Sequence, residues 1–526
     1  MGRAKVVNYY NGKFRGSLTE NECKILDVLR TVEVVPDLKH IIYNLDDSLV
    51  DEMISSMRNY GVLPLIGEKP IGTLKDYQTV GVAYMYWAGS LILGDSVGLG
   101  KTVQASGLIN YLNNEYLNNF GRPVRFLFLT NKNLVEQTRR ELIKFTGEYV
   151  DSVMGEARYC TKFINNNPNG VDFSVIGTHS LLTQPLFTSW LMGCDVFPFD
   201  VIFVDESSVL GNSGQKVTQI VKSARLLFPY FSRVVLLNAT PFETNLKTFV
   251  SQLNLLDSEF LPTLQSIQKE YYIYDYRGMF PRPTGKYKNA DKFKQLVEYR
   301  YFARTRQSLG ARMEDSDGKL IKVPLSEAQK RLLRHVSMWR MVCDCPNYFN
   351  NSFDDDSYVE FDEYNVPKLK ALRELMEGDL VDVDSILLYI PYIEAQNSVV
   401  EWLENRGISV GVLNGDTKNA VRDDIIRKFK SKEYRVLVTN VQRGLNFGSC
   451  DYCIFYSFDP SPQRMAQMEG RITRSFDVIG KHVYLLCSEG REYDYLVEKI
   501  MERAKSSTEF TEVDSSCIMQ LLLKED

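Results

Sequence analysis

The chain has 526 residues, which is more than one compact core usually holds, so two to four domains are expected. Hydrophobic residues make up 44% and charged residues 25%, as in globular proteins, and no run approaches the roughly 18 uncharged apolar residues of a membrane span. The net charge of −5 does not exclude a nucleic-acid partner, because phosphate binding requires only a local groove of positive charge.

Residues 1–70 are predicted to form a small accessory domain of mixed structure. A strand-like start precedes a helix near Asn21–Val32, which opens on a capping-box-like pattern, and a second helix near Asp47–Asn59. The first residues lack the apolar core of a secretory signal. We therefore expect an intracellular soluble protein, located in the cytoplasm or, in a eukaryote, in the nucleus.

Residues 71–259 are predicted to form a first α/β lobe. Short apolar runs alternate with amphipathic stretches there, a pattern typical of a parallel sheet with helices on both faces. The predicted strands are SLILG (90–94), RFLFLT (125–130), FSVIGT (173–178), DVIFVD (200–205) and RVVLLNAT (233–240).

The same alternation returns in residues 366–526, which are predicted to form a second lobe. Its strands are SILLYI (385–390), SVGVLN (409–414), YRVLVT (434–439), YCIFYSF (452–458) and HVYLLC (482–487). Residues 260–365 are less regular: an aromatic and basic stretch, YYIYDYRGMFPRPTGKYKNADKFK, is followed by helical and then acidic sequence. We expect this segment to be an insertion that links two parallel α/β lobes.

A phosphate-binding loop is predicted at residues 94–102, Gly-Asp-Ser-Val-Gly-Leu-Gly-Lys-Thr, between a strand and a helix-like run. Glycines such as Gly98 and Gly100 let backbone N–H groups curl around phosphate. Lys101 would place a positive charge at the β- and γ-phosphates, and the Thr102 hydroxyl would bind Mg²⁺. A strict phosphate loop has glycine where this chain has Asp95. The sequence therefore predicts binding of ATP with Mg²⁺.

An acidic pair, Asp205 and Glu206, ends the predicted strand DVIFVD. An ATPase needs one carboxylate at a strand tip to organise Mg²⁺ and its waters, and another to orient the attacking water. Asp205 fits the first role and Glu206 the second. Their place, one strand before Asn-Ala-Thr-Pro at 238–241, strengthens the assignment.

A third motif, Gln-Met-Glu-Gly-Arg-Ile-Thr-Arg, occupies residues 467–474 of the second lobe. Arg471 and Arg474 are three residues apart and share one helical face. Guanidinium groups can meet the charge that develops on a transferred γ-phosphate. We therefore add Gln467, Arg471 and Arg474 to the candidate catalytic residues.

Over about residues 71–500, these motifs resemble those of superfamily 2 helicases and, within them, the Swi2/Snf2-like DNA translocases. Residues 95–102 look like that family's Asp-Glu-x-Gly-Leu-Gly-Lys-Thr, which accounts for Asp95. Leu-Lys-Asp-Tyr-Gln at 74–78 is similar to its adenine-side motif, so Gln78 is a candidate reader of the base. Residues 238–246 resemble its Thr-Pro-x-x-Asn motif.

Later matches favour the Swi2/Snf2 subgroup over simple DEAD-box RNA helicases. They are Arg-Tyr-Phe-Ala-Arg-Thr-Arg at 300–306, Leu-Asn-Gly-Asp-Thr at 413–417 and Gly-Leu-Asn-Phe at 444–447. Ser207 and Ser208 depart from the family's usual Ala/Gly-His, so coupling between hydrolysis and movement is expected to be built differently. Gly470 is closer to superfamily 2 helicases in general.

The resemblance implies an α/β fold of two tandem RecA-like parallel-sheet lobes, with a small N-terminal domain and an inter-lobe insertion. It implies a nucleic-acid-stimulated ATPase, and the division of motifs between lobes leads to the hypothesis that the arginines reach ATP when a cleft closes. Candidate nucleic-acid contacts are strand-end groups that hold phosphate without reading bases. They are Lys132, Thr178, His179, Thr439 and Asn440, although such groups also cap strand ends.

We therefore expect a monomeric, ATP-dependent translocase that acts on double-stranded DNA without sequence preference, remodelling branched or forked DNA or displacing bound protein. One alternative is a strand-separating DNA or RNA helicase. Another is a nucleic-acid-binding scaffold with a vestigial ATPase, against which the intact Lys101, Asp205 and Glu206 argue. A small-molecule kinase would not explain the second lobe.

Overall fold

The computed structural model describes residues 8–10, 13–15 and 74–524, with gaps at 212–216, 243–244, 257–263, 278–280, 298–299, 353–357, 418, 441–446, 448–449, 474–476 and 512–515. The helices expected near 21–32 and 47–59 lie outside the described residues, as do Arg474 and the Gly-Leu-Asn part of 444–447. Strands β1 (Asn8–Tyr10) and β2 (Lys13–Arg15) pair antiparallel at the strand-like start.

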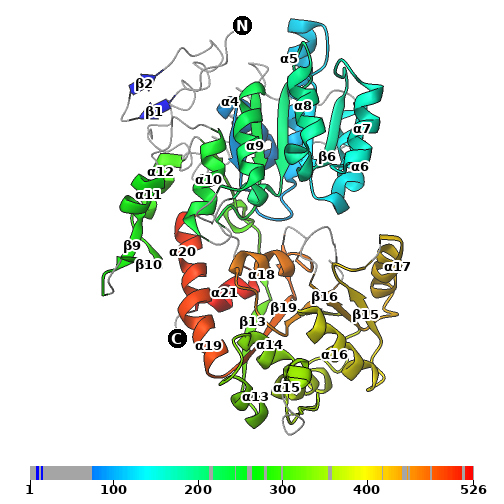
Figure 1. Ribbon diagram of the computed structural model, residues 1–526, viewed down its shortest axis with the longest axis vertical. Helices are drawn as coiled ribbons and strands as arrows, with labels where there is room; N and C mark the ends of the chain where they lie inside the picture. Colours follow the sequence, from blue (N-terminus) through cyan, green and yellow to red (C-terminus); the bar gives the residue numbers. More distant parts are fainter. Residues whose placement is uncertain are drawn as a thin grey trace. The chain divides into compact units, whose positions relative to one another are not determined.

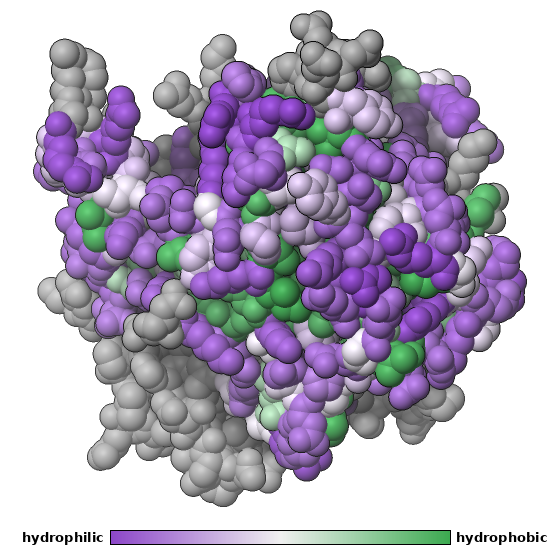
Figure 2. Space-filling view, turned by 90° about the horizontal axis from the view of Figure 1, so that it is seen from below, coloured by the Kyte–Doolittle hydropathy of each residue, from purple (hydrophilic) through white to green (hydrophobic). Residues whose placement is uncertain are grey.

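The chain divides into two compact units (Figure 1). Unit 1 comprises Met1–Leu309 and Ser507–Val513, and unit 2 comprises Gly310–Ser506 and Asp514–Asp526. None of the helices that the structure describes is both long and apolar enough to cross a lipid bilayer. Hydrophilic residues cover most of the face drawn in Figure 2, and apolar residues form smaller groups between them.

Unit 1 is built on a seven-stranded parallel sheet of order β11-β3-β8-β7-β4-β6-β5. Its apolar strands are buried along their length and pack into two hydrophobic clusters with the surrounding helices. The strands are β3 (Leu91–Leu93), β4 (Phe126–Thr130), β5 (Val150–Val153), β6 (Ser174–Thr178), β7 (Val201–Asp205), β8 (Arg233–Leu237) and β11 (Tyr301–Phe302). The helices are α4 (Asp76–Ala88), α5 (Lys101–Phe120), α6 (Val135–Thr146), α7 (Ala157–Asn166), α8 (Pro185–Gly193), α9 (Gln219–Leu227) and α10 (Leu246–Leu256).

Unit 2 is built on a six-stranded parallel sheet of order β13-β19-β17-β14-β16-β15. The strands are β13 (Asp317–Val323), β14 (Ile386–Tyr389), β15 (Val410–Leu413), β16 (Val436–Thr439), β17 (Tyr452–Phe455) and β19 (His482–Ser488), and β12 (Met313–Glu314) pairs separately with β18 (Val478–Ile479). The helices are α13 (Glu327–Leu332), α14 (Trp339–Asp344), α15 (Pro367–Glu377), α16 (Ile393–Glu404), α17 (Asn419–Lys430), α18 (Pro462–Glu469), α19 (Arg491–Tyr495), α20 (Glu502–Phe510, whose last residues belong to unit 1) and α21 (Cys517–Leu523).

All ten strands predicted for the two lobes are present, and the predicted fold class, α/β with two RecA-like parallel-sheet lobes, is confirmed. The segment 260–365 is divided differently from the prediction, at Leu309 and Gly310. Its strand β11 pairs with β3 in unit 1, whereas β13 pairs with β19 in unit 2. A two-residue strand and a polar edge strand give too weak a pattern to be recognised in sequence. The rest of this segment in unit 1 comprises α11 (Leu264–Tyr271), β9 (Tyr272–Asp275), β10 (Arg282–Tyr287) and α12 (Ala290–Val297).

A buried charged cluster holds α14, α15 and α19 of unit 2 together. Lys368 Nζ lies 2.8 Å from both Asp344 Oδ1 and Glu492 Oε1, and all three side chains are buried. Burial raises the pKa of the Asp344 carboxyl to about 6, against the opposing charge of Lys368. Because every member has a charged partner, the cluster is compatible with a dry interior.

Candidate functional site

The predicted phosphate loop joins the buried strand β3 to the first turn of α5 in unit 1. Gly98 and Gly100 have φ angles of 92° and 76°, a backbone region that residues with a side chain rarely adopt. A Cβ atom on Gly100 would also lie 2.6 Å from Gln78 Nε2. Glycine is therefore required where the loop turns into the start of α5, and a glycine-rich turn before a helix N-terminus is an arrangement that binds anions.

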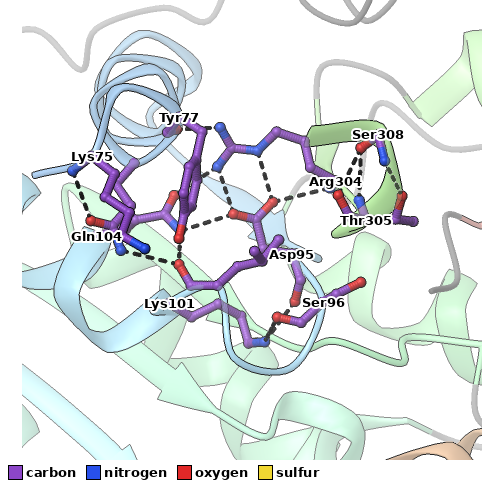
Figure 3. A network of polar contacts seen from close by, with 11 residues as sticks. Lys75, Tyr77, Asp95, Ser96, Lys101, Gln104, Arg304, Thr305 and Ser308 are labelled. Carbon is purple, nitrogen blue, oxygen red and sulfur yellow. Dashed lines mark hydrogen bonds and ion pairs between the residues drawn. The ribbon is translucent and has the colours of Figure 1, made fainter. Parts of the chain in front are cut away.

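The side chain of Lys101 folds back over this loop (Figure 3). Its Nζ donates to the backbone oxygens of Asp95, at 2.6 Å, and Ser96, at 3.3 Å. Loss of hydration and the adjacent Glu206 carboxylate raise the pKa of Asp205, and the positive charge of Lys101 opposes this rise. Strands β3 and β7 both pair with β8 in the parallel sheet, so the loop that follows β3 and the acidic pair at the end of β7 lie at the same edge of the sheet, although they are about a hundred residues apart in sequence.

The acidic pair lies at the end of β7, a strand in the middle of the sheet. Thr130, at the end of the neighbouring strand β4, donates to Asp205 Oδ2 at 3.0 Å. Loss of hydration, followed by the adjacent Glu206 carboxylate, raises the pKa of Asp205 to about 6. Glu206 has a φ of 50°, a strained conformation for a non-glycine residue. A carboxylate that lacks full hydration is suited to binding a cation. Backbone strain such as that at Glu206 is concentrated at functional sites.

A buried ion pair between Asp95 and Arg304 holds the loop in place (Figure 3). Arg304 Nη2 donates to Asp95 Oδ2 at 2.6 Å, and Arg304 Nε to Oδ1 at 3.1 Å, a two-point contact between side chains that are 2% and 0% exposed. The backbone N–H of Arg304 donates to Oδ1 as well, at 3.0 Å. Asp95 therefore acts, in this structure, as the anchor of the loop.

The same guanidinium connects the loop with the two helices beside it. Arg304 Nη2 donates to Gln104 Oε1 at 3.0 Å, and Arg304 Nη1 donates to the carbonyl oxygen of Tyr77 at the start of α4. Gln104 Nε2 in turn donates to Asp95 Oδ2 at 2.8 Å. Gln78 Nε2 donates to the carbonyl oxygen of Leu99 at 3.2 Å, so the predicted adenine-side residue lies against the loop.

Arg304 and Gln104 belong to this site, although the sequence motifs did not identify them as site residues. In sequence, Arg304 is one of several basic residues of the match at 300–306, and its partner Asp95 lies 209 residues away. The pairing of β11 with β3 brings them together. The sequence does contain one signal of this contact. Asp95 is an acidic residue in place of a loop glycine, and its burial would require a positively charged partner from elsewhere in the chain.

The third motif lies in unit 2, on and after α18. Gln467 and Arg471 are buried, whereas Arg474 lies outside the described residues. The intervening Glu469 is fully buried, and its two oxygens accept the backbone N–H groups of Cys517 at 2.8 Å and Ile518 at 2.9 Å. Burial nevertheless raises the pKa of Glu469. Helix α18 is thereby attached to the first turn of α21, a contact that no sequence pattern predicts.

Replacing Glu469 by Gln should loosen this attachment. The amide keeps the shape but presents a donor to one of the two N–H groups, so we expect a loss of about 1.5–3 kcal/mol of unfolding free energy. Denaturant unfolding of the full chain measures it. Glu498→Gln, at an exposed position of the same unit, is the matched control and should change stability by less than about 0.5 kcal/mol. Equal stability of both variants would contradict the role of Glu469.

The predicted nucleic-acid contacts are placed at strand ends, where each has an internal partner. His179 Nε2 lies 2.7 Å from the carbonyl oxygen of Asp205, which links the end of β6 to the acidic pair. Thr178 Oγ1 accepts the N–H of Gly155 at 3.0 Å, Lys132 pairs with Glu156, and Asn440 Nδ2 donates to the carbonyl oxygen of Pro391 at 3.4 Å. Thr439 is buried. These contacts cap the strand ends, and contact with nucleic acid stays a prediction.

A phosphate loop and an acidic pair on one parallel-sheet lobe, with a Gln-x-x-Gly-Arg motif on a second such lobe, define the class of ATP-dependent helicases. Residues 77–365 match the SNF2-related domain, and residues 367–476 match the helicase conserved C-terminal domain. The chain belongs to the SNF2-related family. The predicted family and the enzyme class, a helicase or translocase that hydrolyses ATP, are confirmed at this level.

Over the aligned residues, similar curated proteins are about a fifth identical to this chain. The ATP-dependent helicase YqhH of Bacillus subtilis is 22% identical over 79% of this chain and 75% of its own length. A Xenopus laevis protein, SWI/SNF-related matrix-associated actin-dependent regulator of chromatin subfamily A-like protein 1, is 23% identical over 84% of this chain but only 44% of its own length. The solved structure of the SWI2/SNF2 ATPase core of Sulfolobus solfataricus in complex with dsDNA is 16% identical. The match covers 83% of this chain and 94% of that one, with a TM-score of 0.37. The chain thus spans less than half of the Xenopus relative.

Proposed function

We propose that the chain hydrolyses ATP to translocate along double-stranded DNA, and that it uses this movement to remodel branched or forked DNA or to displace bound protein. The observation that carries the proposal is the presence, at one edge of the parallel sheet, of a glycine-dependent phosphate loop after β3 and a strained acidic turn at the end of β7. Membership of the SNF2-related family, among whose relatives is a regulator of chromatin, favours DNA as the track.

In this proposal, the residues of unit 1 bind and orient the substrate ATP. The loop N–H groups and Lys101 hold the β- and γ-phosphates, and Gln78 contacts the adenine. Glu206, whose backbone φ is 50°, orients the attacking water. Arg471 and Arg474 of unit 2 are assigned to the charge that develops on the γ-phosphate.

The oxygen donors at the site fit Mg²⁺. The Thr102 hydroxyl follows the loop, and the Asp205 carboxylate, partly deprived of water, prefers a nearby cation. When bound, the ion would supply positive charge that neutralises the phosphate groups of ATP. Thr102 and Asp205 are therefore the residues that we assign to it.

Lys132, Thr178, His179, Thr439 and Asn440 are proposed to contact the phosphodiester backbone. Hydroxyl and amide groups at strand ends carry no base code, so binding should be independent of sequence. The contact between His179 and the Asp205 carbonyl connects the end of β6 directly to the acidic pair. DNA bound at the end of β6 would thereby influence the position of the carboxylates.

The ATPase rate on a panel of nucleic acids tests the proposal. We expect blunt duplex, forked and four-way-junction DNA each to stimulate hydrolysis at least tenfold over the protein alone, and single strands to stimulate it much less. Displacement of a third strand from a DNA triplex then measures movement along an intact duplex. Stronger stimulation by single strands would instead indicate a strand-separating helicase, and absence of turnover with every nucleic acid would indicate a scaffold.

A further inference from the structure

An aromatic and basic surface of unit 1 has no part in the site described above. Strand β9 pairs antiparallel with β10, and the hairpin extends from α11 and α12 away from the parallel sheet (Figure 1). A surface hollow of about 580 Å³ lies on it. We call this surface the tyrosine hairpin, and it is lined by Gln268, Lys269, Tyr272, Ile273, Tyr274, Tyr276, Pro281 and Lys288.

Three tyrosines form a row along this hairpin. Tyr272 and Tyr274 alternate along β9, so its extended backbone points them to one side, and Tyr276 follows directly after the strand. Successive ring centroids are 6.4 Å apart in both steps. The row is fixed at one end, because Tyr272 is 8% exposed and packs edge-on against Tyr287, and it is open at the other, where Tyr276 is 73% exposed. The hairpin thus presents aromatic faces from a rigid base.

The charge around the row is positive, in contrast to the chain as a whole. Between positions 269 and 292 the sequence has six Lys or Arg and three Asp or Glu, in a chain of net charge −5. Two of these carboxylates are already paired, Glu270 with Lys292 at 2.7 Å and Asp275 with Arg277 at 2.9 Å. Lys269 and Lys288 line the hollow beside the rings. The surplus positive charge therefore lies where the aromatic faces are.

We propose that the tyrosine hairpin binds single-stranded nucleic acid, with unpaired bases stacked on Tyr274 and Tyr276 and phosphates beside Lys269 and Lys288. Stacking platforms flanked by cations are the general means of holding a strand without reading its sequence. A duplex buries the faces of its bases, so it cannot use the rings. An acidic peptide would use the lysines but has no planar groups for a row of aromatic faces.

This inference extends the proposed function and rests on it in one respect: a translocase that works on forked DNA would meet a single-stranded arm. Binding at the hairpin requires neither ATP nor hydrolysis. The two proposals can therefore fail separately. If the protein had no ATPase activity but still bound single strands through the tyrosines, only the proposed function would be wrong.

Fluorescence anisotropy of the full chain with a labelled oligothymidylate, without nucleotide, tests the rings. We expect Tyr274→Ala/Tyr276→Ala to raise the dissociation constant by 10- to 100-fold, since each stacked ring contributes about tenfold. Tyr274→Phe/Tyr276→Phe keeps the rings and should bind within threefold of the unaltered chain. Tyr364→Ala, at an 80% exposed tyrosine of unit 2, is the matched control and should have no effect. Unchanged binding by the double alanine variant would overturn the proposal.

Salt dependence and competition test the charge. Lys269→Gln/Lys288→Gln should reduce the slope of log Kd against log salt by about 1.4, the value for two phosphate contacts on a single strand. Blunt duplex should bind the tyrosine variants and the unaltered chain equally. If polyglutamate of equal charge displaced the oligothymidylate as well as unlabelled oligothymidylate does, the hairpin would be a surface for acidic protein, and the proposal would be wrong.

Discussion

Lys101→Ala is expected to lower the DNA-stimulated ATPase rate at least 100-fold while leaving the chain folded. The lysine donates to two backbone oxygens of its own loop, and its ammonium group acts on Asp205. These contacts place its positive charge where the β- and γ-phosphates would be held, and such fixed charges in a water-poor site commonly contribute 10²–10³ in rate. Steady-state hydrolysis with saturating duplex DNA measures the effect.

The expected loss of ATPase rate should be specific to Lys101, and two controls test this. Lys144→Ala, at an exposed lysine of α6, should keep the rate of the unaltered chain. Thermal unfolding of Lys101→Ala should change by no more than a few degrees, because the loop itself is held by Asp95 and Arg304. An ATPase rate within threefold of the unaltered chain would remove the ATP-site assignment altogether.

Sequence was sufficient for the parts of the site that lie close together along the chain. Lys101 and Thr102 follow their strand within a few residues, and Asp205 and Glu206 end theirs, so strand patterns and local motifs located both. The parallel strands predicted for the two sheets were likewise long enough and apolar enough to be recognised.

The remaining parts depend on contacts that no local pattern contains. The ion pair of Asp95 and Arg304 is created by strand β11, which has only two residues and joins the edge of the sheet. Glu469 resembles an ordinary helical glutamate until its oxygens meet the N–H groups of α21. Their burial and partners are properties of tertiary structure, and the same applies to the division of the segment 260–365 between the two units.

The ion pair also explains how a loop with an aspartate in a glycine position can be stable. An isolated carboxylate with no exposure would be costly to bury, and here a guanidinium meets it at two points. Because Arg304 also donates to Tyr77 and Gln104, one side chain fixes the relative positions of the loop, α4 and α5. The nucleotide pocket is therefore expected to be formed before ATP arrives.

Arg304→Gln should consequently destabilise the chain and weaken its affinity for ATP. Removing one partner of a buried ion pair leaves an uncompensated charge, which costs about 3–5 kcal/mol of unfolding free energy. Denaturant unfolding measures this loss, and Arg312→Gln, which breaks a pair whose side chains are 63% and 51% exposed, should cost no more than about 1 kcal/mol.

The double variant Asp95→Asn/Arg304→Gln separates charge from shape in the same network. With both charges gone, an amide pair occupies the site and much of the lost stability should return, because no unpaired carboxylate remains buried. The loop would still lack its two-point anchor and the bond to Tyr77, so KM for ATP should stay at least tenfold above that of the unaltered chain even in the stable double variant. Initial ATPase rates over a range of ATP concentrations measure KM. A double variant with normal KM would mean that Arg304 only balances a buried charge and does not position the loop for the nucleotide.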